Sequence, residues 1–412
     1  MTVPWALRRL FQGFAVLAAL GVLGIASLFA FAWLEHRSSV TLPTPTGSFV
    51  VGRAIKDWTD SAALDTLAPV PATKRELLVW IWYPSSAAQS AAKDDYLPAR
   101  LRAKADTSDH ANIWTLLTRD ISNVRGHSVS DADVSPQQRS YPVVILRAGA
   151  SSGVLNYSTL AEDLASHGYV VVGFDAPYRT GRVVFPDGRM MGRTEQNNPE
   201  LCVVPDRNEM ERCVRRVMTA WTGDIAFVLD RLAQLNASDS SRRFTGHLDM
   251  TRVGLLGHSL GGAVAAQFCH EDARCTAGID IDGAPHGSVV REGLAQPFMF
   301  LLSDHGSETD SASVQIERDI QSIYDRIPSD RRLRVSIRGA FHFMFSDDGA
   351  LLKSGIVRGV LRALGKLGID ARRQLAVTTY CVHTFFDHFL KSPGTSALNI
   401  ASPRYPEIQV LE

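Results

Sequence analysis

The sequence predicts an α/β fold, with a doubly wound, mostly parallel sheet and an N-terminal transmembrane helix. After Tyr141, short apolar runs alternate with stretches of helical periodicity, the pattern of parallel strands buried on both faces beneath crossover helices. Near the N-terminus, residues 13–34 contain no charged side chain. The apolar runs after Tyr141 cover 142–146, 169–174, 252–257, 276–281, 297–302 and 333–337.

The composition is that of a globular protein with balanced charge. Of 412 residues, 43 are Lys or Arg and 43 are Asp or Glu, so the formal net charge is zero. A nucleic-acid binder needs a basic excess to neutralise phosphates, and we therefore expect no nucleic-acid partner. Hydrophobic residues make up 45% of the chain and charged residues 21%, values that exclude general disorder.

The N-terminal apolar segment is long enough to cross a membrane. At about 1.5 Å per helical residue, residues 13–34 span a hydrocarbon layer of about 30 Å. Arg8 and Arg9 precede the segment, and a positive flank stays in the cytoplasm. We predict a cytoplasmic N-terminus over 1–9, a transmembrane signal anchor over 10–34, and export of the rest to the periplasm or cell exterior.

A cleaved signal peptide is the alternative interpretation of this segment. Residues 30–32 (Ala-Phe-Ala) form a small-x-small cleavage site, and cleavage there would release a secreted protein starting at Trp33. The apolar run exceeds the usual signal core of about 7 to 15 residues, which favours the anchor. Residues 8–11 (Arg-Arg-Leu-Phe) also resemble a twin-arginine export signal, although such pairs are common before membrane segments.

Five cysteines suit an oxidising compartment, where disulfides persist. Cys202 and Cys213 lie in one predicted loop, and Cys269 and Cys275 are six residues apart across a predicted helix end. We predict these two disulfides and a free thiol at Cys381, with five buried thiols as the alternative. No group of Cys and His has the spacing of a zinc site, so we expect no metal and no cofactor.

The exported part contains one large domain over residues 76–392. Residues 35–75 are rich in Pro and Thr without sustained periodicity, which predicts a linker followed by chain that wraps the domain. An alternating, β-rich strand at 77–83 is followed by residues 85–140, which begin Ser- and Ala-rich and are interpreted as an insertion. Residues 393–412 are expected to form a C-terminal tail.

Helical periodicity fills the intervals between the strands. Residues 222–235 carry apolar side chains every three or four positions, the pattern of an amphipathic helix. Before them, residues 179–220 predict a long loop with a hairpin at 183–191 around a Pro-Asp-Gly turn. Further helices are predicted near 157–167, from 261, near 313–327 and over about 378–390.

A Gly-His-Ser-Leu-Gly pattern over 257–261 joins a predicted buried strand directly to a predicted helix. A turn this tight strains its middle residue and leaves almost no room for side chains at Gly257 and Gly261. It exposes the hydroxyl of Ser259 at the sheet edge, at the positive end of a helix dipole. We therefore assign Ser259 as the nucleophile, with a capping serine in a Gly-rich turn as the structural alternative.

His342 is the candidate general base. In an architecture with this turn the partners follow in the chain order Ser, acid, His. His342 lies just beyond the predicted strand 333–337, at the same sheet edge as Ser259. The other later histidines are three that we assign to surface or packing, His270, His383 and His388, and two loop residues that stay possible, His286 and His305.

Asp282 is the candidate acid that orients the base. It stands at the end of the strand 276–281, where a side chain can reach the imidazole Nδ1–H. Asp280 lies deeper on the same strand face and is expected to be a hydrogen-bonded support. Asp304, after the following strand, is the rival, because many folds of this architecture carry the acid one strand later.

The transition state of acyl transfer needs two backbone donors for its oxyanion. One is the amide of Leu260, the residue after the nucleophile, and the other comes from the loop after strand 142–146. That loop contains small residues over 148–153, and we choose Ala150 as the second donor, with a plain β–α turn as the structural alternative. Together these groups predict hydrolysis of an ester through an acyl-enzyme.

The chain resembles the platelet-activating-factor acetylhydrolase family of α/β-hydrolases, especially its bacterial exported relatives. The resemblance covers most of residues 42–392. It implies an α/β-hydrolase fold, an acid after the strand that follows the nucleophile helix, which supports Asp282, and a calcium-independent esterase for short or oxidised acyl chains, sometimes of phospholipids. It rests on LPTPTG…VGR near 42–53, RELLVWIWYP at 75–84, Asn-Tyr-Ser at 156–158, HGYVVVGFDAPY at 167–178, the VVFPDGR hairpin, GHSLGGA, GIDIDG and IRGAFHFMFSD at 337–347.

Three hypotheses about function follow from these residues. The first is a serine carboxylic-ester hydrolase, held at a membrane by its N-terminal helix and acting on a small-molecule or lipid-derived ester. The second is another reaction on the same scaffold, either acyl transfer to an alcohol or hydrolysis of the polyester or dienelactone type. The third is a catalytically inactive binding protein, which would require a broken set of catalytic residues.

Overall fold

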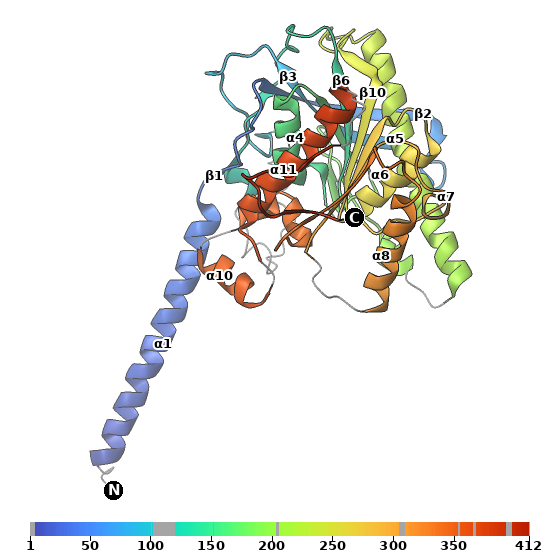
Figure 1. The fold of residues 1–412 in the computed structure, drawn as a ribbon. Coiled ribbons are helices and arrows are strands. Elements are labelled where there is room, and N and C mark those ends of the chain that lie inside the picture. Colours follow the sequence, from blue (N-terminus) through green and yellow to red (C-terminus); the bar gives the residue numbers. More distant parts are fainter. Residues whose placement is uncertain are drawn as a thin grey trace.

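The computed structural model describes residues 5–99, 101, 120–150, 152–202, 206–304, 310–352, 355–365, 368–392 and 398–411. Within these residues a ten-stranded sheet runs through the body of the molecule, with helices on both faces (Figure 1). The predicted α/β fold with a doubly wound, mostly parallel sheet is confirmed. The strand order is β14-β13-β12-β11-β10-β6-β7-β3-β2-β5.

The central strands are the apolar runs of the sequence. All residues of β6, β7, β11 and β12 are buried, because both faces of these strands are covered by helices. Six neighbouring strands are parallel, so their carboxyl ends share one edge of the sheet. They are β6 (Tyr141–Arg147), β7 (Val170–Asp175), β10 (Leu248–His258), β11 (Ala277–Ile281), β12 (Phe298–Leu302) and β13 (Arg332–Ile337).

One flank of the sheet contains a strand that the sequence did not predict. β3 (Lys74–Ser85) pairs antiparallel with β7, and β2 (Val50–Leu64) pairs antiparallel with β3. β2 occupies much of the segment interpreted as linker and wrap. Its periodicity is hidden by polar residues such as Arg53, which is buried against the Asp94 carboxylate at 2.6 Å.

The other flank also differs from prediction. β14 (Ile408–Val410) pairs antiparallel with β13, so this part of the expected tail over 393–412 belongs to the sheet. Three residues are too few to show a strand period. The remaining short strands are β1 (Val40–Thr41), β4 (Val124–Arg125), β5 (Val129–Ser130), and the predicted hairpin of β8 (Arg182–Val184) and β9 (Met190–Gly192).

Helices cover the two faces of the sheet as separate groups (Figure 1). α4 (Ser158–Ser166) and α11 (Ala371–Phe386) pack together over one face, and a π-helical turn over 387–391 extends α11. α5 (Arg207–Ala237), α6 (Leu260–Glu271) and α8 (Ser311–Tyr324) lie on the other. The short helices are α7 (Val289–Glu292), α9 (Asp348–Leu351) and α10 (Gly355–Ala363).

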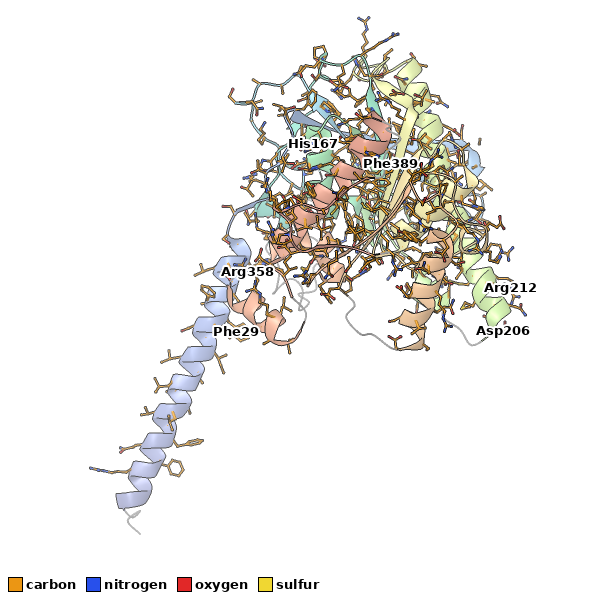
Figure 2. All side chains as sticks on the ribbon, viewed as in Figure 1. Phe29, His167, Asp206, Arg212, Arg358 and Phe389 are labelled. Atoms are coloured by element: carbon orange, nitrogen blue, oxygen red, sulfur yellow. A yellow bond between two sulfur atoms is a disulfide. The ribbon has the colours of Figure 1, made fainter. Side chains whose placement is uncertain are left out.

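α5 begins 15 residues earlier than the predicted start at residue 222. The side chain of Asp206 caps its first turn by accepting from the Glu209 amide at 2.7 Å. Asp206 and Arg212 lie at the free end of the helix, away from the sheet (Figure 2). This end packs little apolar surface and shows no apolar period, so the sequence predicted a loop there. α11 likewise starts seven residues before the predicted 378, behind the cap Asp370.

The predicted disulfides are confirmed. Cys202 pairs with Cys213 and Cys269 with Cys275, with Cα–Cα distances of 5.3 and 5.0 Å. Cys381 is free and buried in the core. The first bridge ties the free end of α5 to the preceding loop, and the second closes the end of α6 onto the approach to β11.

α1 (Trp5–Arg37) projects away from the body, and its side chains over residues 11–31, Phe29 among them, are exposed (Figures 1 and 2). Its segment Phe11–Arg37 has a mean hydropathy of 2.4 and none of it is buried, so by length and composition it can cross a membrane. The carboxyl-terminal end of α1 is fixed to the body, where the Asp120 amide donates to the His36 carbonyl at 2.8 Å.

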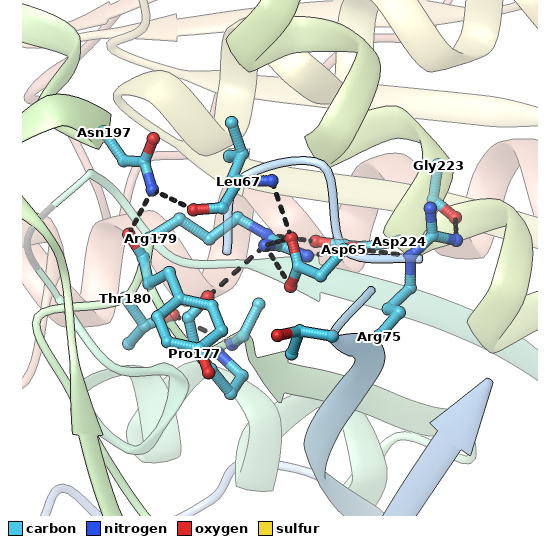
Figure 3. Close-up of polar contacts among 12 residues, drawn as sticks. Asp65, Leu67, Arg75, Pro177, Arg179, Thr180, Asn197, Gly223 and Asp224 are labelled. Carbon is cyan, nitrogen blue, oxygen red and sulfur yellow. Dashed lines mark hydrogen bonds and ion pairs between the residues drawn. The ribbon is translucent and has the colours of Figure 1, made fainter. Parts of the chain in front are cut away.

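A buried ionic network braces the flank beside β7 (Figure 3). The guanidinium of Arg179 is 1% exposed and binds Asp65 at 2.8 Å and Asp224 at 2.7 Å. Arg75 adds a second cation, with its Nε 3.5 Å from Asp224, so the two buried carboxylates are compensated by two guanidinium groups. The network joins the turn after β2, the loop after β7 and α5, and so fixes the scaffold behind the carboxyl edge of the sheet.

Candidate active site

Ser259 occupies a strained turn between β10 and α6. Its backbone has φ +55° and ψ −126°, a region that side-chain-bearing residues rarely adopt. The Ser259 amide donates to the Ile281 carbonyl at 2.8 Å, which ties the turn to β11. A Cβ at Gly257 would stand 2.0 Å from the Gly261 carbonyl oxygen, so both glycines are required by close approach of the backbone.

His342 and Asp282 come together at the same edge of the sheet. The His342 Nδ1–H donates to Asp282 Oδ2 at 2.7 Å. The Asp282 side chain is 1% exposed, and Ser303 donates to both of its oxygens, from its amide at 2.8 Å and from its hydroxyl at 2.7 Å. These donors hold the carboxylate in one orientation, so it can fix the imidazole with Nε2 directed away from it.

The expected support Asp280 and the rival acid Asp304 have other contacts. Asp280 is fully buried and accepts from the Gly283 amide at 2.9 Å, in keeping with the support that the sequence suggested. Burial raises the pKa of Asp280 well above its usual value. Asp304 accepts from the Gly339 amide at 2.6 Å and thereby holds the start of the loop that carries His342.

Ser259, Asp282 and His342 line one cavity of about 610 Å³. α8 also lines this cavity, and its polar lining residues include Glu317 and Arg318. The cavity therefore offers space beside Ser259 for a small organic molecule. A nucleophile, an oriented imidazole and adjoining space are the elements of acyl transfer.

The two candidate oxyanion donors flank Ser259. Leu260 is the first residue of α6, where backbone amides point toward the turn. Ala150 follows Gly149, whose backbone comes so close that an added Cβ would lie 3.3 Å from the Ser259 Cβ. Two backbone segments thus approach the nucleophile from different loops, as an oxyanion hole requires.

Sequence reasoning did not assign roles to Ser303, Tyr157 or His258. Ser303 directly follows β12 and supports Asp282. Tyr157 and His258 form a buried hydrogen bond of 2.7 Å beneath the nucleophile turn. The signal for His258 was its place next to Ser259 in the glycine pattern, and for Tyr157 its place after the loop that carries Ala150.

One further group of His and Asp residues could be considered for a metal. Asp163, His167 and His383 place their ligand atoms within 4.8 Å of one another. The two imidazole rings stack, however, with centroids 4.0 Å apart and planes at 20°. A metal ion binds in the plane of each ring, and nearly parallel planes do not meet at one ion. We therefore interpret the group as a hydrogen-bonded cluster, in which His383 Nδ1 contacts Asp163 at 3.0 Å.

With this geometry established, similarity to known proteins identifies the family. The model of the family "Platelet-activating factor acetylhydrolase, isoform II" matches residues 34–392. The chain belongs to this family. A probable 1-alkyl-2-acetylglycerophosphocholine esterase of Arthroderma benhamiae is 26% identical over an alignment of 399 positions that covers 91% of this chain and 95% of that protein.

Two further relatives extend the comparison. The platelet-activating factor acetylhydrolase of Cavia porcellus is 26% identical over an alignment of 227 positions that covers 50% of this chain and 48% of that enzyme. A ferulic acid esterase structure from Streptomyces cinnamoneus superposes with a TM-score of 0.72 at 25% identity, covering 91% of this chain and all of that one. Family and neighbour agree on the reaction class, and this family member is a carboxylic-ester hydrolase with the α/β-hydrolase fold.

Proposed function

We propose that the protein is a serine esterase that works through an acyl-enzyme on Ser259. His342 Nε2 takes the proton of the Ser259 hydroxyl while Oγ attacks the ester carbonyl carbon. The amides of Leu260 and Ala150 stabilise the oxyanion, and the alcohol leaves with the proton from His342. Water then repeats the sequence on the acyl-enzyme, releasing the acid. Asp282 holds the imidazole and stabilises its charged form.

One observation carries this proposal: a serine in a strained strand-to-helix turn shares a cavity with an imidazole bound to a buried carboxylate at 2.7 Å. An inactive binding protein has no need of that strain, which costs on the order of 1–3 kcal/mol.

A fluorophosphonate probe tests the nucleophile directly. We expect the folded protein to react at one serine, mapped by mass spectrometry to Ser259, and Ser259→Ala to lose both labelling and p-nitrophenyl acetate turnover. Ser240→Ala, at an exposed loop position, is the matched control and stays fully reactive. Labelling at another serine, or equal turnover by Ser259→Ala, would refute the proposal and favour the inactive-scaffold hypothesis.

We propose short-chain or lipid-derived esters as the substrate class. Support comes from the names of the relatives, one an esterase of an acetylated glycerophosphocholine and one a ferulic acid esterase. The decisive panel compares p-nitrophenyl acetate, butyrate and palmitate, 2-acetyl glycerophosphocholine lipids and methyl ferulate. We expect the highest kcat/KM for acetyl esters with a lipid alcohol, and a preference for methyl ferulate or palmitate would overturn this assignment. Added alcohol as acceptor separates hydrolysis from acyl transfer.

We also propose that α1 anchors the enzyme in a membrane, with the catalytic domain outside the cytoplasm. Phe11–Arg37 is apolar and unburied, and Arg8 and Arg9 precede it. Two disulfides fit an oxidising compartment. Mass spectrometry of the mature protein is expected to find the complete N-terminus in the membrane fraction. A soluble product that starts at Trp33 would replace the anchor by a cleaved signal peptide.

A further inference from the structure

A buried chain of hydrogen bonds runs beneath the nucleophile. Tyr157 is 1% exposed and His258 5%. The Tyr157 hydroxyl lies 2.7 Å from His258 Nδ1, and the other ring nitrogen of His258 lies 3.0 Å from the carbonyl oxygen of His342. At the opposite end of the chain, the Gly149 amide donates to the Tyr157 hydroxyl at 3.4 Å.

The direction of every bond in this chain is determined by chemistry. A carbonyl oxygen only accepts, so His258 Nε2 must carry the hydrogen that points to His342. Burial, aided by the neighbouring imidazole of His342, lowers the pKa of His258 to about 3, so its ring is neutral and Nδ1 is an acceptor. The Tyr157 hydroxyl therefore donates to Nδ1, and its oxygen receives the Gly149 amide hydrogen.

These bonds connect three segments whose relative positions matter for the proposed reaction. Gly149 precedes the oxyanion donor Ala150, His258 precedes Ser259, and the carbonyl belongs to His342 itself. The rings of His258 and His342 also contact each other, with centroids 4.5 Å apart. One tyrosine and one histidine thus touch all three loops without facing the cavity that Ser259, Asp282 and His342 line.

A second set of contacts fixes Tyr157 to the loop of His342. The fully buried Asp347 accepts from the amides of Ser158 and Thr159 at 2.9 and 3.1 Å, at the start of α4. Its own amide donates to the Asn156 carbonyl at 2.6 Å. The residues on both sides of Tyr157 are therefore tied to the segment that follows His342. These contacts fix the position of the Tyr157 hydroxyl relative to the turn at Ser259.

We propose that Tyr157 and His258 are positioning residues, which couple the oxyanion loop at 149–150 to the loop that carries His342 and set both against Ser259. This inference rests on the proposed catalytic roles of those groups. A rotation of the His342 backbone would move the imidazole relative to Ser259, and a shift of Gly149 would move the Ala150 amide. Since misplacement of about 1 Å is costly to a transition state, both effects reduce kcat more than substrate binding.

Tyr157→Phe is the main test, because it removes one oxygen and keeps the buried ring. We expect kcat for p-nitrophenyl acetate to fall about tenfold, the effect of a shifted donor rather than a lost one, with KM within twofold of wild type. Tyr141→Phe is the matched control: its hydroxyl is also buried and donates to a backbone carbonyl, that of Ser135, at 2.9 Å. The control is expected to lose comparable thermal stability and to keep its kcat.

His258→Phe tests the other half of the chain. It should lower kcat like Tyr157→Phe, and the double variant should be no slower than the slower single variant, because both break the same chain. Nitrogen NMR of the imidazoles gives a readout independent of turnover: His258 stays in the neutral Nε2–H form to at least pH 5 in wild type, and its Nδ1 resonance shifts in Tyr157→Phe.

The outcomes separate this inference from the proposed function. If wild type is labelled at Ser259 but Tyr157→Phe matches Tyr141→Phe in kcat, or the two effects on kcat multiply in the double variant, the positioning role is wrong. If Ser259→Ala retains turnover, the proposed function fails whatever the Tyr157 variant does. An Nδ1–H form of His258 in wild type would overturn the coupling in either case.

Discussion

Two aspartate–histidine pairs lie at opposite edges of the sheet. At the carboxyl edge His342 Nδ1 bonds Asp282 at 2.7 Å, and near the amino edge, beside the start of β7, His383 Nδ1 bonds Asp163 at 3.0 Å. Both carboxylates are buried, with side chains 1% and 3% exposed. Pair geometry alone does not distinguish them.

The surroundings of the two aspartate–histidine pairs distinguish them. The first pair borders a cavity of about 610 Å³ that it shares with Ser259. The second is closed by the stacked ring of His167 and by Thr46, whose amide and hydroxyl both lie 2.8 Å from Asp163 Oδ1. An oriented imidazole alone therefore does not mark a catalytic site, and of the two pairs only the first has Ser259 and open space beside it.

Removal of His342 should abolish most of the activity, whereas removal of His383 should leave the activity nearly unchanged. We expect His342→Ala to lower kcat for p-nitrophenyl acetate by several orders of magnitude, up to about 10⁶-fold as in serine triads of this type. His383→Ala, which keeps the active-site edge intact, should stay within twofold of wild type. Steady-state kinetics at a temperature well below both melting points make the comparison. Near-normal turnover by His342→Ala would remove it as the base.

The carboxylates give the next largest difference. Asp282→Asn keeps the shape of the site but favours the wrong imidazole tautomer, and a loss of about 10⁴-fold in kcat is expected. Asp163→Asn should leave kcat nearly unchanged. Asp304→Asn is the rival variant, and since Asp304 accepts from the Gly339 amide whereas Asp282 bonds the His342 imidazole, we expect a loss far below that of Asp282→Asn. A larger loss for Asp304→Asn would transfer the role of acid to it.

The sequence predicted the placement of the candidate site better than the flanks of the sheet, because the residues of the site follow local rules. The glycines around Ser259 are dictated by backbone approach, and parallel strands bring Asp282 and His342 to one edge wherever their loops lie in the chain. The pairing of Tyr157 with His258 depends on contact across 101 residues, which no local pattern contains.

The elements that the sequence did not predict, the first half of α5 and strand β2, lack a periodic apolar pattern. The first half of α5 is stabilised by the Asp206 cap and by the disulfide to Cys213, and its face is mostly solvated. β2 includes Arg53, buried by ion pairing with Asp94, which broke the alternation expected of a strand. In both cases contacts with other parts of the chain stabilise the element, so it forms without the periodic apolar pattern from which a helix or strand is predicted.

The loss of thermal stability should be larger for His383→Ala than for His342→Ala, the reverse of their expected losses of activity. Without His342, both oxygens of Asp282 still accept from Ser303. Without His383, Asp163 Oδ2 keeps only a contact of 3.9 Å with His167 among the described interactions, so a buried carboxylate oxygen loses its close donor. We expect His383→Ala to lower the free energy of unfolding by about 1–3 kcal/mol and His342→Ala by less. Equal melting temperatures would contradict this asymmetry.

The smallest expected effect is a difference in pH dependence at the amino-edge cluster. Burial, aided by the adjacent His383 and by Lys391, lowers the pKa of His167 below its usual 6.5, although Asp163 and Asp387 oppose the shift. The unfolded chain therefore binds a proton at higher pH than the fold does. The stability from this residue is complete above about pH 6.5 and is lost as the pH falls toward the pKa of the folded state.

His167→Gln removes that titration while keeping a side chain that can hydrogen-bond Thr46. We expect the fall in melting temperature between pH 7.5 and pH 5 to be smaller in His167→Gln than in wild type, by about 1–2 °C for each kcal/mol of pH-dependent stability that the variant removes. His247→Gln is the control, since His247 lies outside the cluster, against the Arg139 carbonyl. If both variants keep the wild-type slope, the stacked pair contributes nothing to acid sensitivity, and the two edges differ in chemistry but not in their response to protons.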